Sequence, residues 1–226
     1  MAYQPEELPA DFAEALGGVR DRLGPLGSPI LYFSSAGSTN DVAAKLAAAG
    51  HQEGAVVIAD AQTAGRGRRG RGWFSPPRAG LYVSVVVNPA GAPFARRERA
   101  GALLTLAAGV ALAEAVQRAT GLALDIKWPN DLVAGGRKVA GILAEAVIDQ
   151  TQAGASVVLG YGINVAPSAF PAELRDRATS LEGELGRPVD RAALCAETLA
   201  GVAARYGDLL EGRFDAILDR WRGLAP

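Results

Sequence analysis

The stretch "DLVAGGRKVAGILAEAVI", residues 131–148, decides the class of fold. Apolar residues stand on both sides of the pair Gly135-Gly136, a pattern typical of a β-hairpin with a tight turn. A further strand-like run, "SVVLGYGINV", follows at residues 156–165. Strands joined by a tight hairpin must pair antiparallel. We therefore do not expect a doubly wound parallel sheet.

The segments around this hairpin alternate between strand-like and helix-like patterns. Further strands are expected at residues 30–33, 54–60, 80–88 and 122–128, and helices at residues 40–49, 95–120, 190–212 and 213–221. For the first of these helices, Ser38 and Asp41 fit a capping box and Gly50 a C-terminal stop. The first 28 residues have room for one or two short helices. This order predicts an α+β domain with a mixed β-sheet flanked by helices.

The composition excludes several classes of protein and site. The chain has 226 residues and a net charge of −1, whereas a protein that coats nucleic acid is usually basic overall. The single cysteine, Cys195, rules out a disulfide framework and is expected to be buried packing, and the single histidine, His51, rules out a His-rich metal site. The acidic N-terminal segment does not resemble a signal peptide, and we expect no membrane span. The protein is expected in the cytoplasm.

The segment "TAGRGRRGRGWFSPP", residues 63–77, carries four arginines and the letters of the dinucleotide-binding pattern G-x-G-x-x-G. That pattern requires a helix after the third glycine, which Pro76-Pro77 forbids here. A glycine-rich loop with four cations can order around a polyanion. We interpret the segment as a mobile cationic lid with Trp73 at its far end, while a solvated surface loop remains the alternative.

Alternate residues on the two late strands suggest a pocket beside this loop. Gly141 and Gly160 fall on one small-residue face, and glycine within a strand often marks the close approach of a ligand. The segment "KWPND" (residues 127–131) and Lys138 add charge nearby. Tight helix–sheet packing is the alternative explanation for the glycines, and ordinary surface exposure is the alternative for Lys127.

Four motifs in order resemble the catalytic domain of biotin–protein ligases: "STN", "QTAGRGRRGRGWFSP", "KWPNDL…RKVAGIL" and "GYGINV". The resemblance covers roughly residues 30–181. It implies the fold shared with lipoate ligases and related to class II aminoacyl-tRNA synthetases. It also implies a two-step reaction: biotin and ATP give biotinyl-5′-AMP and pyrophosphate, with Mg²⁺, and a lysine of the biotin carboxyl carrier domain of acetyl-CoA carboxylase then takes the biotin.

The same resemblance implies roles for individual residues. Lys138, Arg66 and Arg68 would be catalytic, and Lys138 would bridge the biotin carboxylate and the α-phosphate. Residues implied to bind biotin are Ser38, Thr39, Asn40, Gln62, Gly65, Arg66, Gly67, Arg68, Lys138, Gly141, Leu143 and Gly160. Residues implied at the ATP or adenylate end are Arg71, Trp73, Lys127, Asn130 and Asn164. The metal ligands remain unknown.

Residues 1–28 are expected to be an extension without a winged helix, and residues 29–226 the catalytic domain, without the C-terminal SH3-like barrel usual in the family. DNA binding is accordingly not expected, and a homodimer is compatible with the sequence. Two alternatives stay open: a lipoate or octanoate ligase or transferase of the same fold, and an Arg/Gly nucleic-acid-binding module. The transferase branch uses a nucleophilic cysteine, and Cys195 lies in the wrong kind of segment for that.

Overall fold

A computed structural model describes residues 4–49, 53–89, 93, 96–148 and 155–226. Within these residues, seven strands form one sheet in the order β1-β2-β3-β7-β6-β5-β4. Only β1 and β2 run parallel, and every other neighbouring pair is antiparallel. The predicted mixed sheet is therefore confirmed. The strands are β1 (Ile30–Phe33), β2 (Val56–Ala59), β3 (Gly80–Val87), β4 (Asp125–Lys127), β5 (Asp131–Ala134), β6 (Arg137–Ile148) and β7 (Ala155–Asn164).

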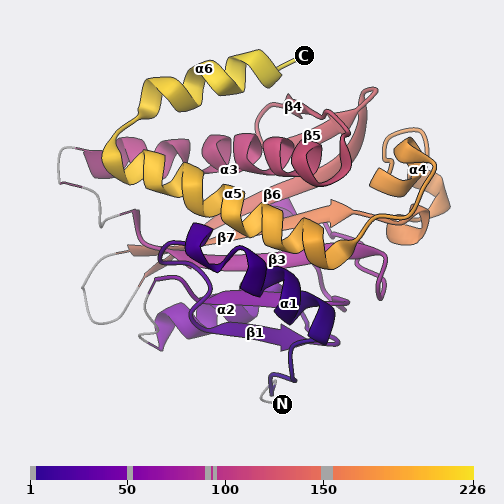
Figure 1. The fold of residues 1–226 in the computed structure, drawn as a ribbon, viewed down its shortest axis with the longest axis horizontal. Helices are drawn as coiled ribbons and strands as arrows, with labels where there is room; N and C mark the ends of the chain where they lie inside the picture. Colours follow the sequence, from indigo (N-terminus) through magenta and orange to yellow (C-terminus); the bar gives the residue numbers. More distant parts are fainter. Residues whose placement is uncertain (1–3, 50–52, 90–92, 94–95, 149–154) are drawn as a thin grey trace.

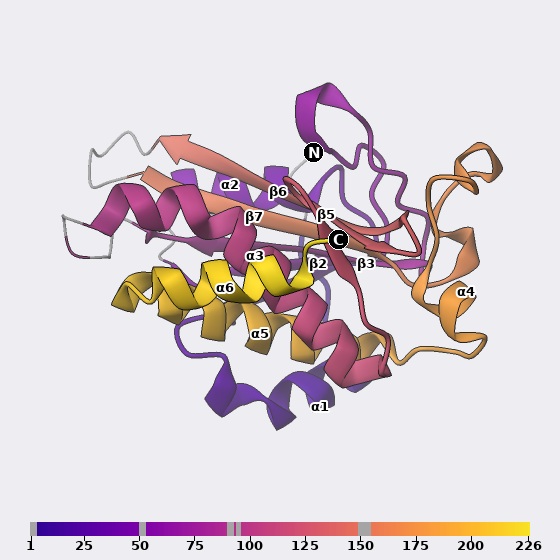
Figure 2. The same ribbon diagram turned by 90° about the horizontal axis from the view of Figure 1, so that it is seen from above.

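Helices cover both faces of this sheet (Figure 1). Figure 2 shows α2 on one side, together with the arginine-rich loop, and α1, α3, α5 and α6 on the other. The helices are α1 (Ala10–Gly18), α2 (Thr39–Ala48), α3 (Arg97–Thr120), α4 (Leu181–Leu185), α5 (Arg191–Glu211) and α6 (Phe214–Leu224). The loop and the N-terminus of α2 therefore share one face of the sheet.

Alternation along the strands divides the core into two layers. Val56 and Ile58 of β2 belong to the larger hydrophobic cluster with α1, α3 and α5, whereas Val57 and Ala59 belong to a smaller cluster beneath α2. Successive side chains on a strand point to opposite faces, so a strand covered on both faces must be apolar throughout. This explains why β2 and β3 are continuous apolar runs.

The helix α3 has the length and apolar composition of a membrane-spanning helix. It is packed against α5, α6 and β6, and most of its apolar window is buried inside the protein. A core helix passes the same compositional test.

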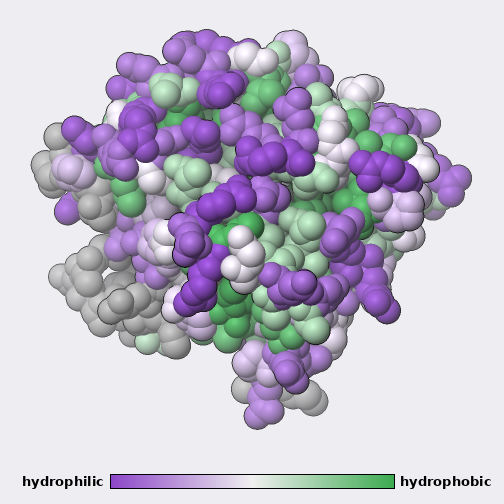
Figure 3. All heavy atoms as spheres, in the orientation of Figure 1, coloured by the Kyte–Doolittle hydropathy of each residue, from purple (hydrophilic) through white to green (hydrophobic). Residues whose placement is uncertain are grey.

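The face of the molecule drawn in Figure 3 is a mixture of hydrophilic and hydrophobic areas.

The predicted elements appear with small shifts of their ends. The hairpin turns at Gly135 and Gly136, both with positive φ, as expected. The predicted capping box is wrong: Ser38 is the N-cap of α2, but its side chain makes no capping hydrogen bond. The predicted helix stop Gly50 lies outside the described residues, and so do His51 and the expected helix start at Ala95.

Candidate active site

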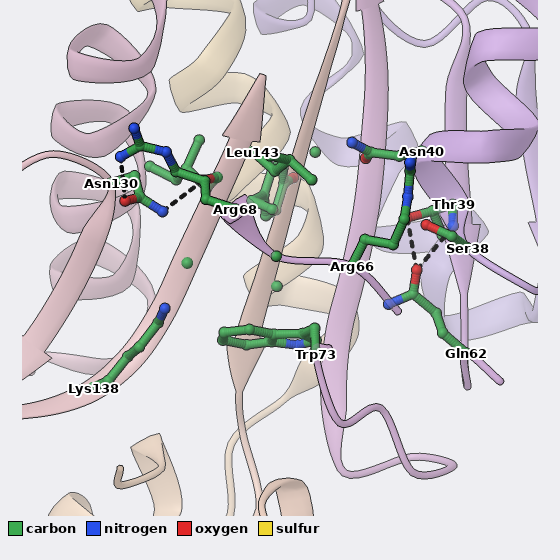
Figure 4. A pocket seen from close by; sticks show the side chains of 16 residues that line it. Ser38, Thr39, Asn40, Gln62, Arg66, Arg68, Trp73, Asn130, Lys138 and Leu143 are labelled. Atoms are coloured by element: carbon green, nitrogen blue, oxygen red, sulfur yellow. Dashed lines mark hydrogen bonds between the residues drawn. The ribbon is translucent and has the colours of Figure 1, made fainter. Parts of the chain in front are cut away.

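A pocket opens between the arginine-rich loop, the N-terminus of α2, and strands β6 and β7 (Figure 4). Its lining comes from segments far apart in the sequence. The lining residues are Ser38, Thr39, Asn40, Gln62, Arg66, Gly67, Arg68, Trp73, Asn130, Lys138, Gly141, Ile142, Leu143, Gly160, Tyr161 and Gly162. The sequence motifs that were far apart in the chain thus converge on one site.

The arginine-rich loop forms a small hairpin and contains no α-helix. Its turn has Arg69 at φ 58° and Gly70 at φ 72°, and the Arg71 amide donates to the Arg68 carbonyl at 3.3 Å. Two positive φ angles in succession are the mark of a type I′ turn. Trp73 N donates to Gly65 O at 2.8 Å and closes the base of the hairpin. The rejection of a dinucleotide-binding turn is therefore confirmed.

Glycines on β6 and β7 form the floor of the pocket. A Cβ at Gly160 would lie 1.9 Å from Asn40 Oδ1, and a Cβ at Gly162 would lie 2.6 Å from Trp73 Nε1. A Cβ at Gly141 would lie 3.0 Å from the Trp73 ring. Glycine is therefore required at positions 160 and 162, because Asn40 and Trp73 approach the strand backbone too closely for any side chain.

One end of the pocket, here called the neutral polar end, is lined by uncharged hydrogen-bonding side chains, several of them buried, with the Arg66–Glu145 ion pair beside them. The oxygen Gln62 Oε1 accepts hydrogen bonds from Thr39 N at 2.8 Å and from Thr39 Oγ1 at 3.2 Å. Asn40 donates from Nδ2 to Glu145 Oε2 at 2.7 Å, which fixes its amide orientation, because a carboxylate only accepts. Ser84, fully buried on β3, then donates to Asn40 Oδ1 at 2.6 Å.

The other end of the pocket is cationic. Lys138 Nζ lies 2.7 Å from Asp131 Oδ1 and 5.0 Å from the centroid of the Trp73 ring. Arg68 Nη1 donates to Asn130 Oδ1 at 3.0 Å, and Asn130 Nδ2 donates to the Ile142 carbonyl at 2.9 Å. Figure 4 shows Lys138, Arg68 and Asn130 gathered on one side of the pocket, opposite Ser38, Thr39 and Gln62.

Some residues expected at the ATP end line adjoining hollows. Arg71 and Lys127 border a hollow with Lys138 and Arg177, and Asn164 borders another with Trp73 and Lys138. The Asn164 amide is buried and donates to the Thr179 carbonyl at 3.0 Å. Gly65 does not line the pocket; a Cβ there would lie 2.4 Å from the Trp73 carbonyl, so glycine permits closure of the hairpin.

Arg66, expected both to bind biotin and to be catalytic, lies apart from Lys138 in the structure (Figure 4). Its Nη2 lies 2.8 Å from Asp41 Oδ1 and 2.8 Å from Glu145 Oε2, at the neutral polar end of the pocket. Two carboxylates thus hold a guanidinium that the sequence grouped with the catalytic cations. The alternating-residue pattern placed Glu145 on the strand face of Gly141, but no motif singled it out.

Further residues at the pocket carried no signal that assigned them to it: Ile142, Tyr161 and Gly162 line the pocket, and Ser84 and Arg177 contact residues that do. Ser84 lies in an apolar run that gave no polar signal, and Gly162 was visible only as a strand glycine. Arg177 supports Lys138 from outside the sheet, where its carbonyl accepts from Lys138 N at 2.8 Å. No sequence spacing connects Arg177 with Lys138, because the loop between β7 and α4 brings them together.

Cys195 lies in α5, away from the pocket, and is fully buried. Burial disfavours the thiolate and raises the pKa of this thiol to about 12. A nucleophilic cysteine is normally accessible and has a lowered pKa. The prediction that Cys195 is packing is confirmed.

The chain matches the family model described as biotin/lipoate A/B protein ligase over residues 32–164, more than half of its length. It is 38% identical over 202 residues to the bifunctional ligase/repressor BirA of Bacillus subtilis, covering 88% of this chain and 60% of that protein. It is 43% identical over 149 residues to the biotin–[acetyl-CoA-carboxylase] ligase of Mycobacterium tuberculosis, covering 64% of this chain and 52% of that one. The chain thus spans between half and two thirds of these relatives.

The fold also matches a solved structure, the biotin protein ligase from Aquifex aeolicus in complex with biotin and ATP. The TM-score is 0.74 at 29% sequence identity, and the match covers 87% of this chain and 78% of that one. The expected fold is confirmed by this match.

Proposed function

Because the chain belongs to the biotin/lipoate A/B protein ligase family, we propose that it is an ATP-dependent biotin–protein ligase. It joins biotin to AMP and then transfers biotin to a lysine of an acceptor protein. The acceptor we propose is the biotin carboxyl carrier domain of acetyl-CoA carboxylase, in keeping with the name of the Mycobacterium tuberculosis relative. Since ATP is a substrate, the reaction belongs in the cytoplasm.

The division of the pocket into a neutral polar end and a cationic end carries this proposal. Biotin has a neutral ureido ring at one end and a carboxylate at the other. Hydrogen-bonding side chains such as Thr39 and Gln62 suit the ring, because they supply donors and acceptors without charge. Lys138 and Arg68 suit the carboxylate and the phosphate that it attacks.

In the first step, a carboxylate oxygen of biotin attacks the α-phosphorus of ATP, the bond to the β-phosphate breaks, and pyrophosphate leaves. Two anions must approach each other, and negative charge moves onto the phosphoryl oxygens. Lys138 offsets this charge between the two reacting groups, and Arg68 adds a second cation. The Lys138 Nζ must exchange its contact with Asp131, 2.7 Å away, for the reacting oxygens.

The polyphosphate of ATP would enter the hollow lined by Arg71, Lys127 and Arg177 beside Lys138. Trp73 and Asn164 border the adjoining apolar hollow, which suits the adenine ring. In the second step, the acceptor lysine attacks the biotinyl carbonyl and AMP leaves with the electron pair. The nucleophile comes from the acceptor, so the chain needs no serine or cysteine of its own.

The arginine-rich hairpin would shield the adenylate, a mixed anhydride that water hydrolyses. A closed loop excludes water from such an intermediate and keeps it for the correct acceptor. Arg66, Gly67 and Arg68 already line the pocket from above. The mobility of this lid remains a prediction.

We propose that Mg²⁺ arrives with ATP and is held mainly by phosphate oxygens, as is usual for this ion. Within the described part of the chain, no three metal-ligating side chains form a cluster. We therefore assign no step to a metal held by the protein alone. The repressor activity in the name of the Bacillus subtilis relative is that protein's and is not part of this proposal.

Exchange of labelled pyrophosphate into ATP tests the proposal, because it reports the first step without the acceptor. Biotin should trigger exchange, and lipoate and octanoate should not. Exchange with lipoate alone would overturn the proposal in favour of a lipoate ligase of the same fold. The same preparation without any acid is the control, since it measures the background exchange of label into ATP.

A further inference from the structure

We propose that Glu145 and Asp41 are positioning residues, which hold the arginine-rich hairpin over the pocket through their ion pairs with Arg66. This inference rests on the proposed function, because it assigns these two carboxylates to the biotin end of the same site. It separates Arg66, which fastens the loop, from Arg68 and Lys138, which face the reacting groups.

The first observation is the double contact of one guanidinium nitrogen. Arg66 Nη2 lies 2.8 Å from Asp41 Oδ1 on α2 and 2.8 Å from Glu145 Oε2 on β6. Two carboxylates share one cation, so the cluster of these three residues carries a surplus negative charge. A ligand anion at this end would be repelled, whereas a neutral ureido ring would not.

The second observation is that Glu145 Oε2 also accepts a hydrogen bond from Asn40 Nδ2 at 2.7 Å. Asn40 is buried at the start of α2 and accepts from the buried Ser84 hydroxyl. Glu145 therefore joins the loop to a rigid part of the fold and not merely to another surface side chain. Figure 4 shows Arg66 extended alongside Asn40.

The third observation is that the hairpin can transmit this restraint along its length. Arg66 pairs with Gly72 across the hairpin, and Gly67 N donates to the Arg71 carbonyl at 2.7 Å. Ion pairs that fix the Arg66 side chain therefore restrain both arms of the hairpin. Arg66, Gly67 and Arg68 line the pocket, so the position of this arm sets the roof over the bound ring.

The strength expected of this tether is modest. The side chains of Arg66, Asp41 and Glu145 are 42%, 50% and 34% exposed, so solvent weakens each ion pair. Loss of Glu145 removes one pair and leaves Asn40 Nδ2 without its acceptor. We expect an effect of roughly 3- to 10-fold on the affinity for biotin, and none on chemistry at the Lys138 end.

Limited digestion with trypsin measures the tether directly, because Arg68, Arg69 and Arg71 in the hairpin are cleavage sites. Mass spectrometry would follow cleavage after these residues, with and without biotin, in the wild type and in Glu145→Gln and Glu145→Ala. We expect the slowest cleavage in the wild type, faster cleavage in Glu145→Gln, which keeps a neutral acceptor, and the fastest in Glu145→Ala. Asp41→Asn should resemble Glu145→Gln.

The matched control is Asp215→Ala, which breaks the ion pair between Arg99 and Asp215 on α3 and α6, far from the loop. It should leave loop cleavage and the kinetic constants at wild-type values. Steady-state kinetics of the Glu145 variants should show KM for biotin raised roughly 3- to 10-fold, with kcat and KM for ATP within about 2-fold of the wild type.

Equal rates of loop cleavage in Glu145→Ala and the wild type would overturn the inference. A fall in kcat with an unchanged KM for biotin would also overturn it, because Glu145 would then act at the reacting end. If Glu145→Ala does not fold, Asp41→Asn, at a half-exposed site, decides the question. Cleavage of the loop without substrates does not depend on any reaction, so it tests the inference about Glu145 alone. If the wild type shows no biotin-dependent pyrophosphate exchange, the proposed function is refuted, and the cleavage experiment still decides whether Glu145 holds the loop.

Discussion

Replacing Gly160 by alanine should abolish tight binding of biotin while leaving the fold intact. An alanine Cβ at this position would lie 1.9 Å from Asn40 Oδ1, whereas ordinary contacts begin near 3.4 Å. Asn40 must therefore move by about 1.5 Å. After this shift it cannot keep the two hydrogen bonds that it makes in the wild type, to Ser84 Oγ at 2.6 Å and to Glu145 Oε2 at 2.7 Å.

The magnitude follows from these two contacts. A buried polar group that loses its partner costs about 1–3 kcal/mol, and two such contacts are lost in this variant. If partial rearrangement recovers some of this, about 2–4 kcal/mol separates the displaced Asn40 from the arrangement that the biotin end of the pocket requires. Binding that restores this arrangement must supply that energy, which corresponds to roughly a 30- to 700-fold weaker affinity. Isothermal titration calorimetry with biotin would measure it.

The matched control is Gly207→Ala in α5, where a Cβ would meet nothing within 4 Å. It should bind biotin normally and raise the free energy of unfolding by about 0.5–1 kcal/mol, because alanine favours a helix over glycine. An affinity of Gly160→Ala within 2-fold of the wild type, in a folded protein, would refute the idea that Asn40 shapes the biotin end of the pocket.

Three further predictions concern other residues. Lys138→Ala should reduce biotin-dependent pyrophosphate exchange by about 100- to 1,000-fold with biotin binding changed far less, and exchange near the wild-type rate would contradict the role of Lys138. The guanidinium groups of Arg22 and Arg118 lie 2.7 and 2.9 Å from the Glu197 carboxylate and lower the pKa of this carboxyl group to about 2. The ionised carboxylate therefore stabilises the fold fully above about pH 4.5, and this stabilisation is lost as the pH falls toward 2. Glu197→Gln should therefore lower the free energy of unfolding by about 1–2 kcal/mol at pH 7 in urea titrations, with a difference that shrinks on acidification and not on alkalinisation. The Cys195 thiol, with its pKa raised to about 12 by burial, should react with thiol reagents at pH 8 only after unfolding, and rapid labelling of the native protein would contradict its burial.

The fold was largely predictable because its signals are local. The glycine pair at Gly135-Gly136 gives a turn, and the apolar runs of β2 and β3 indicate strands covered on both faces. Helix ends were less predictable. Ser38 has the side chain of a capping residue, yet it lines the pocket and makes no capping hydrogen bond.

The candidate site was predictable where a residue carries its signal in a motif. Gly141 and Gly160 stood out as glycines within strands, and they do lie on one pocket floor. Glu145 and Ser84 could not be found in this way, because their importance depends on contacts across 79 and 44 positions of sequence. The charge of Arg66 is visible in the sequence, but its pairing with Asp41 and Glu145 is not, because those contacts also join distant positions.

A structure of the protein with biotin and a non-hydrolysable ATP analogue would show which end of biotin each end of the pocket holds. We expect the ureido ring beside Thr39, Asn40 and Gln62, and the biotin carboxylate together with the α-phosphate within hydrogen-bond distance of Lys138 Nζ. Biotin bound in the opposite direction, or bound outside the pocket beneath the arginine-rich hairpin, would refute the proposed division of the pocket.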